Sequence, residues 1–162
     1  MPMGNFTLQL EAFHKKTMNS IKLASQKIAM EAFKRVIEKS PVGDPSKWDA
    51  AFVAAGTALG WFDKNYVGGR FRANWGVSIG SPFVGTNEDH DKTPVGSRGG
   101  KTIANAVFAG AKWNGRGSIF LCNNLPYSQK LETGYSRLQA PSGMVRLTVA
   151  EMQNGAAEAA IR

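Results

Sequence analysis

The stretch that decides the fold runs from Ile119 to Arg146 and reads IFLCNNLPYSQKLETGYSRLQAPSGMVR. Its apolar beginning predicts a strand over residues 118–122, and the Asn and Pro residues that follow predict a tight turn. A short helix over 128–133 then ends at Gly134, and a loop rich in Pro and Gly leads into a last helix from Val145 to about Ala160. No residue of the stretch is typical of a nucleophile, a metal ligand or a general base. The stretch therefore specifies a shape rather than a reaction.

Upstream, residues from about Leu8 to Lys39 are predicted to form one long helix. Apolar residues recur there at steps of three and four, the spacing of one helical face, at Ile21, Ala24, Ile28, Ala32 and Val36. Pro41 cannot continue a helix, and it pushes Ser40 out of the helical region. The predicted helix is longer than a domain of this size needs to cover one sheet. We therefore expect it to extend beyond its own domain and to contact another molecule.

The middle of the chain combines a helix, a strand and a long loop. Asp44-Pro45 is a helix start and predicts an inserted helix that ends at Gly60. Residues 71–79 alternate between apolar and polar and predict a strand with one buried face. Residues 80–100 are rich in Gly, Pro, Asp, Ser and Thr, and predict a loop of a length that is uncommon unless the loop has a role. Residues 103–111 predict a further short helix.

Together these elements predict one α+β domain over residues 1–162. A small, mostly antiparallel sheet is covered by the long N-terminal helix and the C-terminal helix, with an inserted segment at 43–68 and a long loop at 80–100. The chain has 162 residues, of which 43% are hydrophobic. A chain of this size can bury a stable core without disulfides.

Charge and cysteine content narrow the possible partners. The formal net charge of +8 favours an anionic neighbour, either nucleic acid or an acidic protein surface, although basic residues spread along a chain are equally typical of solvated faces. Cys122 is the only cysteine, so no internal disulfide is possible, and it lies in an apolar strand pattern. We therefore expect its side chain to be buried as a small apolar group and not to react as a thiol. The lack of disulfides fits a protein of the reducing cytoplasm. The first residues lack the pattern of a signal peptide, and no apolar run is long enough to span a bilayer.

Two segments are similar to anion or metal sites but lack essential parts of them. Residues 96–102 end like a phosphate-binding loop, but Val95 stands where the first Gly should be and no apolar strand precedes it. Residues 88–91 are acidic but consecutive, whereas a calcium loop spaces its ligands at alternate positions. Neither His14 nor His90 has a Cys or Ser nearby that suggests a catalytic triad. We expect no catalytic residue, no metal and no cofactor, and therefore no enzyme.

Arg70 and Arg72 allow two interpretations. With the aromatic residues between and after them, they could form a nucleic-acid-binding stripe, in which cations contact phosphates and rings stack on bases. In a strand, however, the two arginines share one face and the aromatic residues share the other. That favours a subunit interface or a structural salt bridge. Glu132 could pair with an arginine of a neighbour, and Arg70 and Arg137 are the candidates.

Three blocks of sequence, in this order, resemble the neck family of long-tailed bacteriophages, whose members are also described as tail-completion, head–tail joining or minor tail proteins. The first is the long helix that ends in Ser40-Pro41-Val42. The second is Gly69-Arg70-Phe71-Arg72-Ala73-Asn74-Trp75 and the strand after it. The third is Asn-Asn-Leu-Pro-Tyr, Leu-Glu-x-Gly and Ala-Pro-x-Gly-Met-Val-Arg within 119–146. The chain departs from the family in the inserted segment 43–68 and in Gly68-Gly69-Arg70, where the family has Thr-Gly-Arg.

The resemblance implies a structural virion protein, assembled in the host cytoplasm, that joins the head connector to the tail and helps to complete the tail. It implies a homo-oligomeric ring, a hexamer or else a dodecamer, whose partners are portal-side connector and tail-terminator or tail-tube proteins, with no membrane. Positions carried over as fold signature or subunit interface are Arg70, Arg72, Asn74, Trp75, Asn123, Asn124, Pro126, Tyr127, Glu132, Gly134, Arg137, Pro141 and Gly143. Arg98, Lys101 and Arg116 are the residues that could face DNA in the ring without reading its sequence.

Two other functions stay open on the sequence alone. A basic DNA-binding protein would explain the charge, and its monomer would bind duplex DNA with an affinity that falls as salt rises. A phosphate- or nucleotide-using enzyme would depend on residues 96–102 alone, and a nucleotide with magnesium would stabilise it against heat.

Overall fold

The computed structural model describes residues 4–60, 65–97 and 100–160. The elements of these residues follow one another along the chain as α1 (Gly4–Lys39), the short 3₁₀ helix η1 (Pro45–Lys47), α2 (Ala50–Ala58), α3 (Arg70–Ala73), β1 (Gly76–Ile79), α4 (Lys101–Ala111), β2 (Ile119–Cys122), α5 (Ser128–Glu132) and α6 (Val145–Ala160).

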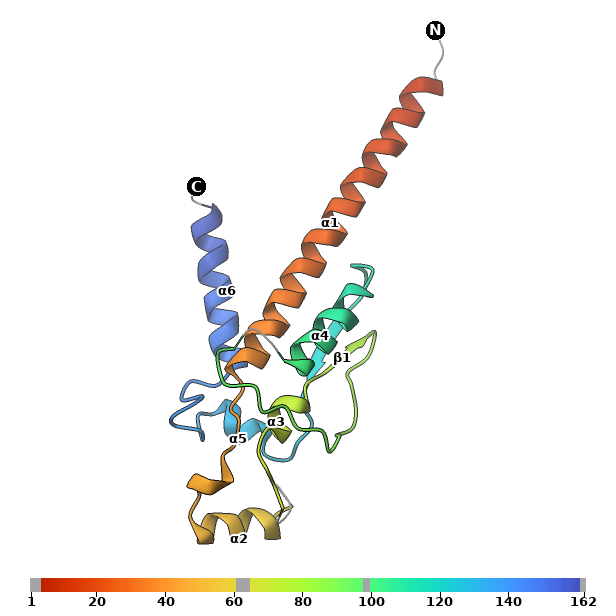
Figure 1. Ribbon diagram of the computed structural model, residues 1–162. Helices are drawn as coiled ribbons and strands as arrows, with labels where there is room; N and C mark the ends of the chain where they lie inside the picture. Colours follow the sequence, from red (N-terminus) through yellow and green to blue (C-terminus); the bar gives the residue numbers. More distant parts are fainter. Residues whose placement is uncertain (1–3, 61–64, 98–99, 161–162) are drawn as a thin grey trace.

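Helix α1 is the longest of these elements, and only its C-terminal part lies against the rest of the chain. In Figure 1 its N-terminal part extends far beyond every other element, and α6 leaves the same side of the molecule at an angle to it. The helix ends at Lys39, as predicted. The Ser40 hydroxyl that follows donates to the Val36 carbonyl at 2.9 Å and accepts from the Trp75 indole N–H at 2.7 Å. The end of α1 is thereby bonded to the residue just before β1.

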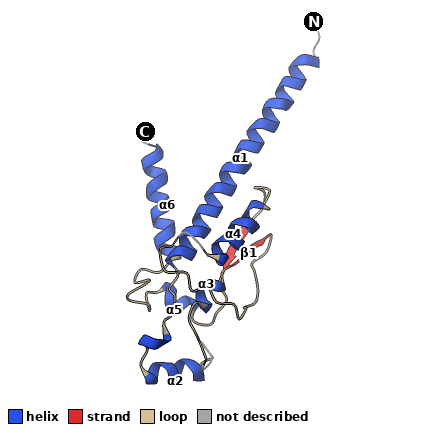
Figure 2. Cartoon of the chain, in the orientation of Figure 1, coloured by secondary structure: helices blue, strands red, loops and turns tan. Residues whose placement is uncertain are grey.

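A two-stranded antiparallel sheet lies beside the C-terminal part of α1 (Figure 2). Strand β1 pairs with β2 in a register that places Gly76 opposite Cys122, whose free thiol is only half-buried. The sheet packs against α1 and α4 through one buried cluster, and α3, the turn after β2 and the start of α6 meet in a second. The buried members are Ile37, Ile103 and Ala106 in the first, and Val36, Phe71, Leu125, Ala140 and Met144 in the second. The predicted α+β fold class is confirmed, with α4 as a further helix over the sheet.

The strand predicted over residues 71–79 is wrong in its first half. Residues 70–73 form the single helical turn α3, and only β1 is extended. The turn begins after Gly69, whose φ of 81° lies in the left-handed region that favours glycine. Phe71 is 3% exposed and Arg72 is 0% exposed, so both faces of this segment are buried. The alternation of apolar and polar residues in this segment therefore does not correspond to one buried and one exposed face.

The inserted segment contains two short helices in place of the one predicted from Asp44. The Asp44 carboxylate accepts from the Ser46 amide at 3.2 Å and starts η1. A second carboxylate, that of Asp49, accepts from the Phe52 amide at 2.7 Å and starts α2. The helix therefore begins later than predicted, and residues 61–64, which follow its end, lie outside the described residues.

The described part of the 80–100 loop contains neither helix nor strand, as predicted. Its path is held by side chains and backbone of the same chain. The Asn124 side-chain amide donates to the carbonyls of Phe83 and Gly85 at 2.9 and 3.1 Å. The Gly96 amide donates to the carbonyl of Glu38, in the last turn of α1, at 2.8 Å. The described part of the loop is thus bonded to the turn after β2 and to the last turn of α1.

Candidate assembly surface

Arg72, predicted to lie on an open strand face, is buried and bonds to the long loop. Its guanidinium donates to the carbonyls of Thr93 and Pro94, the latter at 2.9 Å, and to that of Ser97 at 3.5 Å. A side chain that is 0% exposed cannot contact a phosphate or a neighbouring subunit. The nucleic-acid stripe considered for Arg70 and Arg72 is therefore wrong, because a buried guanidinium satisfies loop carbonyls instead.

Arg70 forms the structural salt bridge that was the alternative interpretation. Its Nη2 atom lies 2.6 Å from Glu88 Oε1, and its side chain is only 15% exposed. Asn74 bonds to the same loop, because its side-chain amide donates to the Asn87 carbonyl at 3.0 Å and its oxygen accepts from the Asn87 amide at 2.8 Å. Asn123 donates to the Phe71 carbonyl at 2.8 Å. These carried-over positions hold the chain's own loops in place.

Glu132 also acts within its own chain. Its carboxylate accepts from the backbone amides of Met144, Val145 and Arg146 at 2.9, 3.0 and 2.8 Å, at the start of α6. Its main-chain carbonyl accepts from the Arg146 guanidinium at 2.7 Å. The expected pairing with a neighbour's Arg70 or Arg137 is not what this carboxylate does, because a helix start offers several unpaired N–H groups to one anion.

Two signature glycines allow this arrangement. Gly143 has a φ of 75°, and a Cβ there would collide with Glu132. Gly134 has a φ of 89°, and a Cβ there would collide with the carbonyl oxygen of Pro141. The sequence block that contains these residues is therefore a local packing unit that places the start of α6.

Replacing Glu132 with Ala is expected to lower the free energy of unfolding by about 1–3 kcal/mol, because it leaves several amides at the start of α6 without an acceptor. Glu132→Gln keeps one accepting oxygen and should lose less. Urea unfolding followed by circular dichroism measures both. Equal stability of the Ala variant and the parent protein would contradict the role given to this carboxylate.

In the segment that is similar to a phosphate-binding loop, the Asp91 side chain bonds to the start of the following helix, α4. At the beginning of α4, Asp91 Oδ2 accepts from the Thr102 amide at 3.2 Å, and Asp91 Oδ1 accepts from the Thr93 amide at 3.0 Å. Asp91 is 6% exposed. A carboxylate therefore stands where a phosphate would have to bind, which agrees with the interpretation of 96–102 as a basic loop. Arg98 itself lies outside the described residues.

Asp91 gives the fold a sensitivity to acid. Burial alone would raise the pKa of its carboxyl, but hydrogen bonds from Thr102 and Thr93 outweigh burial and lower that pKa to about 2. A lowered folded-state pKa contributes stability that is complete above the unfolded-state pKa, near 4, and is lost as the pH falls toward 2. We expect Asp91 to contribute on the order of 1–2 kcal/mol in this way. Thermal unfolding between pH 5 and pH 2 should show a smaller acid loss for Asp91→Asn than for the parent protein.

No group of three or more His, Cys, Asp or Glu side chains that could hold a metal ion occurs among the described residues. The same residues include no helix long and apolar enough to cross a membrane. Of the residues expected to face DNA, Lys101 is exposed at the start of α4 and lies 4.0 Å from Asp89, whereas Arg116 is exposed beyond the other end of that helix. About 15 Å of helix separates them. The two cations do not form one patch.

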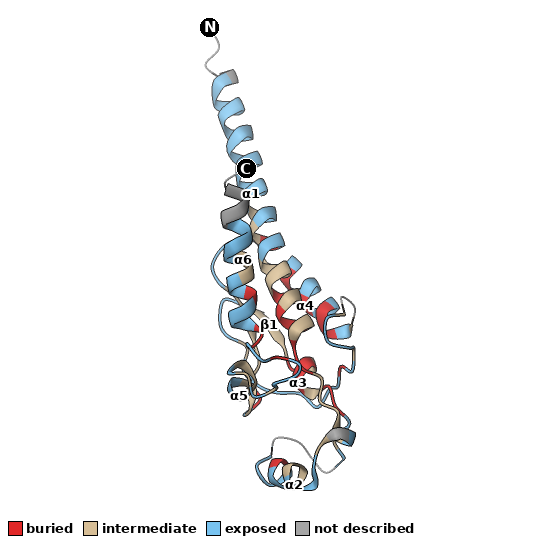
Figure 3. Cartoon of the chain, turned by 90° about the vertical axis from the view of Figure 1, so that its left-hand side faces the viewer, coloured by how far each residue is buried: buried red, intermediate tan, exposed pale blue. Residues whose placement is uncertain are grey.

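An exposed apolar surface runs along the N-terminal part of α1. Seven residues at steps of four, three and four, none of them charged, form a stripe along the helix that we call the α1 stripe: Phe6, Leu10, Phe13, Thr17, Ile21, Ala24 and Ile28. Their exposure includes 71% for Phe6, 68% for Phe13 and 59% for Ile28. Figure 3 shows the N-terminal part of α1 as exposed, in contrast to its C-terminal end, and residues 6–21 are all exposed.

The α1 stripe faces away from the chain's own core. Gln26 is buried, and its amide donates to the Ala111 carbonyl at 2.9 Å, so its side of α1 faces α4. Residues two apart in a helix lie about 200° apart around the axis, which places Ala24 and Ile28 on the opposite side. Of the helical face predicted from Ile21, Ala24, Ile28, Ala32 and Val36, the first three residues are exposed, Ala32 is half-buried and Val36 is in the core. The side of α1 that faces the core also contains Gln26, Phe33 and Ile37.

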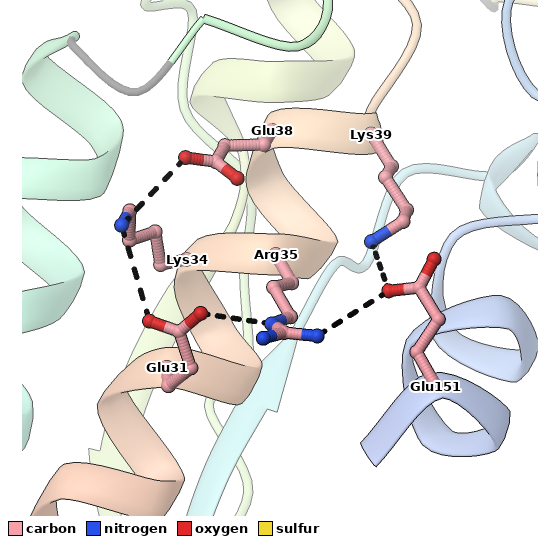
Figure 4. Close-up of polar contacts among 6 residues, drawn as sticks. All are labelled: Glu31, Lys34, Arg35, Glu38, Lys39 and Glu151. Atoms are coloured by element: carbon pink, nitrogen blue, oxygen red, sulfur yellow. Dashed lines mark hydrogen bonds and ion pairs between the residues drawn. The ribbon is translucent and has the colours of Figure 1, made fainter. Parts of the chain in front are cut away.

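An ion-pair network fixes the base of α1 against α6 (Figure 4). Lys39 Nζ and Arg35 Nη1 lie 2.8 and 3.6 Å from Glu151 Oε2, and Arg35 Nε lies 2.8 Å from Glu31 Oε1. Single pairs at a surface are worth little, but a network on two helices restricts their relative orientation. The projecting part of α1 is thus held in one direction.

A pocket of about 560 Å³ lies beyond the C-terminal end of α1, between α2, α5 and the segment after α5. Trp48 and Tyr66 stack there with ring centroids 5.5 Å apart, and Phe52 lies edge-on to Trp48 at 5.3 Å. Tyr135 is 55% exposed and Leu138 is 98% exposed, and both line the pocket. Arg137, one of the carried-over positions, is exposed beside them.

Comparison of the chain with models of protein families, with curated proteins and with solved structures finds no match. The resemblance to phage neck proteins therefore stays an expectation from three sequence blocks. The exposed surfaces that could contact another molecule are the α1 stripe and the pocket lined by Trp48, Phe52 and Tyr66, which we call the aromatic pocket. Most of the carried-over residues are partly or fully buried, whereas four of them are exposed: Asn124, Pro126, Pro141 and, at the pocket, Arg137.

Proposed function

We propose that this chain is a non-enzymatic structural subunit of the neck of a long-tailed bacteriophage, where copies of it form a ring between the head connector and the tail. The observation that carries the proposal is the α1 stripe, an uncharged apolar face on a helix that extends beyond its own fold. An exposed apolar face of this extent on a soluble chain marks an interaction surface.

Burial of the stripe supplies a driving force for assembly. Each of its large apolar side chains contributes about 1–2 kcal/mol when its exposed part is removed from water. Five such side chains, Phe6, Leu10, Phe13, Ile21 and Ile28, give a sum of the same order as the cost of bringing two molecules together. In a closed ring each subunit contacts two neighbours, so there is one such contact per subunit and no open end is left.

The polar groups also support a structural role. Arg72, Asp91 and Glu132 are the side chains whose chemistry could have suggested a site, and each is engaged with backbone groups of the same chain. The net charge of +8 suits a ring through which DNA passes, with contacts to phosphate alone. Partners on the portal side and on the tail side belong to the same proposal.

Deleting the gene for this chain from the phage that encodes it tests the proposal. We expect DNA-filled heads and separate tails that fail to join, and we expect the chain supplied from a plasmid to restore joined particles. Purified particles should contain the chain in a fixed ratio to the portal protein. Normal particles without the chain, or its absence from particles, would contradict the proposal. A free DNA-binding protein would instead leave particle structure unchanged and would bind duplex DNA as a monomer.

A further inference from the structure

We infer that the tip of α1 of one subunit, formed by Phe6, Leu10 and Phe13, occupies the aromatic pocket of the next copy of this chain. The inference rests on the proposed function, because it identifies the surface of the neighbour that covers part of the α1 stripe. Its basis is the chemistry and the placement of two surfaces at opposite ends of one helix.

The pocket is built to receive apolar side chains. Its walls are the Trp48, Phe52 and Tyr66 rings from the inserted segment and the Leu131 side chain of α5. Leu138, at 98% exposed, packs on little of its own chain although it lines the opening. A volume of about 560 Å³ lies within the range of sites that enclose a small ligand, and is large enough for aromatic side chains.

The tip of α1 offers side chains of matching kind and spacing. Phe6 and Phe13 are two turns apart, with Leu10 between them on the same face. The two phenylalanines are 71% and 68% exposed, and they present roughly 280 Å² of aromatic surface if a buried ring is worth about 200 Å². Aromatic rings meeting an aromatic wall gain edge and stacking contacts in addition to burial.

The chain cannot make this contact with itself. Pro41 and Val42, which line the pocket, follow the C-terminal end of α1, whereas the tip lies at the N-terminal end. A continuous helix from Phe6 to Lys39 holds the two about 50 Å apart. The tip of one copy can therefore reach only the pocket of another copy.

The contact is head-to-tail, because each chain contributes one tip and one pocket. Such contacts close into rings when the rotation between neighbours permits. The charges of the two surfaces are compatible with this contact. Near the tip, Lys15 and Lys16 outnumber Glu11, and the pocket contains two acidic and two basic residues, which are Asp44, Asp49, Lys130 and Arg137. In a closed ring every tip and every pocket is filled.

A mixing experiment with two full-length variants tests the inference. The tip variant is Phe6→Ser with Phe13→Ser, and the pocket variant is Tyr135→Ser with Leu138→Asp. All four side chains are more than half exposed, so the fold should be retained, and circular dichroism checks this. We expect each variant alone to lose the ring, with subunit affinity reduced roughly 30-fold or more. We expect the two variants mixed to form a one-to-one heterodimer in native mass spectrometry, because one intact tip then meets one intact pocket.

The matched control is Val84→Ser, which removes an apolar side chain that is 89% exposed and lies outside both surfaces. It should assemble as the parent does. A pocket variant that still forms the parent ring would overturn the inference and leave the proposed function standing. Two variants that both lose assembly but form no heterodimer when mixed would also overturn it. A parent protein that never associates would overturn both.

Discussion

Replacing Leu10 and Ile21 of the α1 stripe with Lys is expected to convert the assembled protein into monomers. Lysine keeps the helix, because it is a good helix former. It places two charges at the centre of an uncharged apolar face, where they would be desolvated without partners. We expect the dissociation constant between subunits to rise about 100-fold or more, which sedimentation velocity or native mass spectrometry measures directly.

The matched control changes Leu8 and Met18 of the same helix to Lys. These residues are 66% and 38% exposed but lie outside the stripe. The control has the same added charge and the same loss of exposed apolar surface, so it should assemble as the parent does. If both double variants lose assembly equally, the effect comes from charge on α1 and the stripe is not the contact face. If neither loses assembly, the stripe has no role in association.

Replacing Arg72 with Ala is expected to lower the free energy of unfolding by about 3–5 kcal/mol. The change removes a fully buried guanidinium and leaves the carbonyls of Thr93 and Pro94 without a donor. It also removes the bonds that hold the 80–100 loop against α3. For a chain of this length the midpoint of thermal unfolding should fall by about 10 °C.

Urea unfolding of Arg72→Ala, Arg72→Lys and Arg137→Ala separates this effect from loss of charge. The Lys variant should be intermediate, because its single ammonium lacks the planar fork that reaches several carbonyls. Arg137 is exposed, so its Ala variant should stay within about 0.5 kcal/mol of the parent. An Arg72→Ala protein as stable as the parent would show that the loop is held by other contacts.

Much of the fold could be predicted because local signals agreed with one another. Pro41 and the helix formers before it predicted where α1 ends, and the 119–146 stretch predicted β2, α5 and the start of α6 in the right order. The prediction was wrong for α3, where a strand was expected. Four residues are too few to tell a helical turn from a strand, and the deciding bonds come from a loop about twenty residues away in sequence.

The candidate site was harder to predict, for a physical reason. Arg, Asn and Glu in a sequence are expected at surfaces, yet Arg72 and Asn74 are buried because carbonyls of the long loop accept their hydrogens. The apolar steps of α1 were visible in the sequence, but the pattern does not say which side faces the core. The exposure of the stripe and the contact of Gln26 with the end of α4 show that the stripe faces outward.

The central claim is that the exposed face of α1 is an interface between copies of this chain in a closed ring. Native mass spectrometry of the purified full-length chain, repeated over a dilution series, tests it most directly. We expect a single closed species, a hexamer or a dodecamer, that gives way to monomer on dilution without a ladder of larger forms. A chain that stays monomeric at every concentration, or that grows into open filaments of all lengths, would contradict the account.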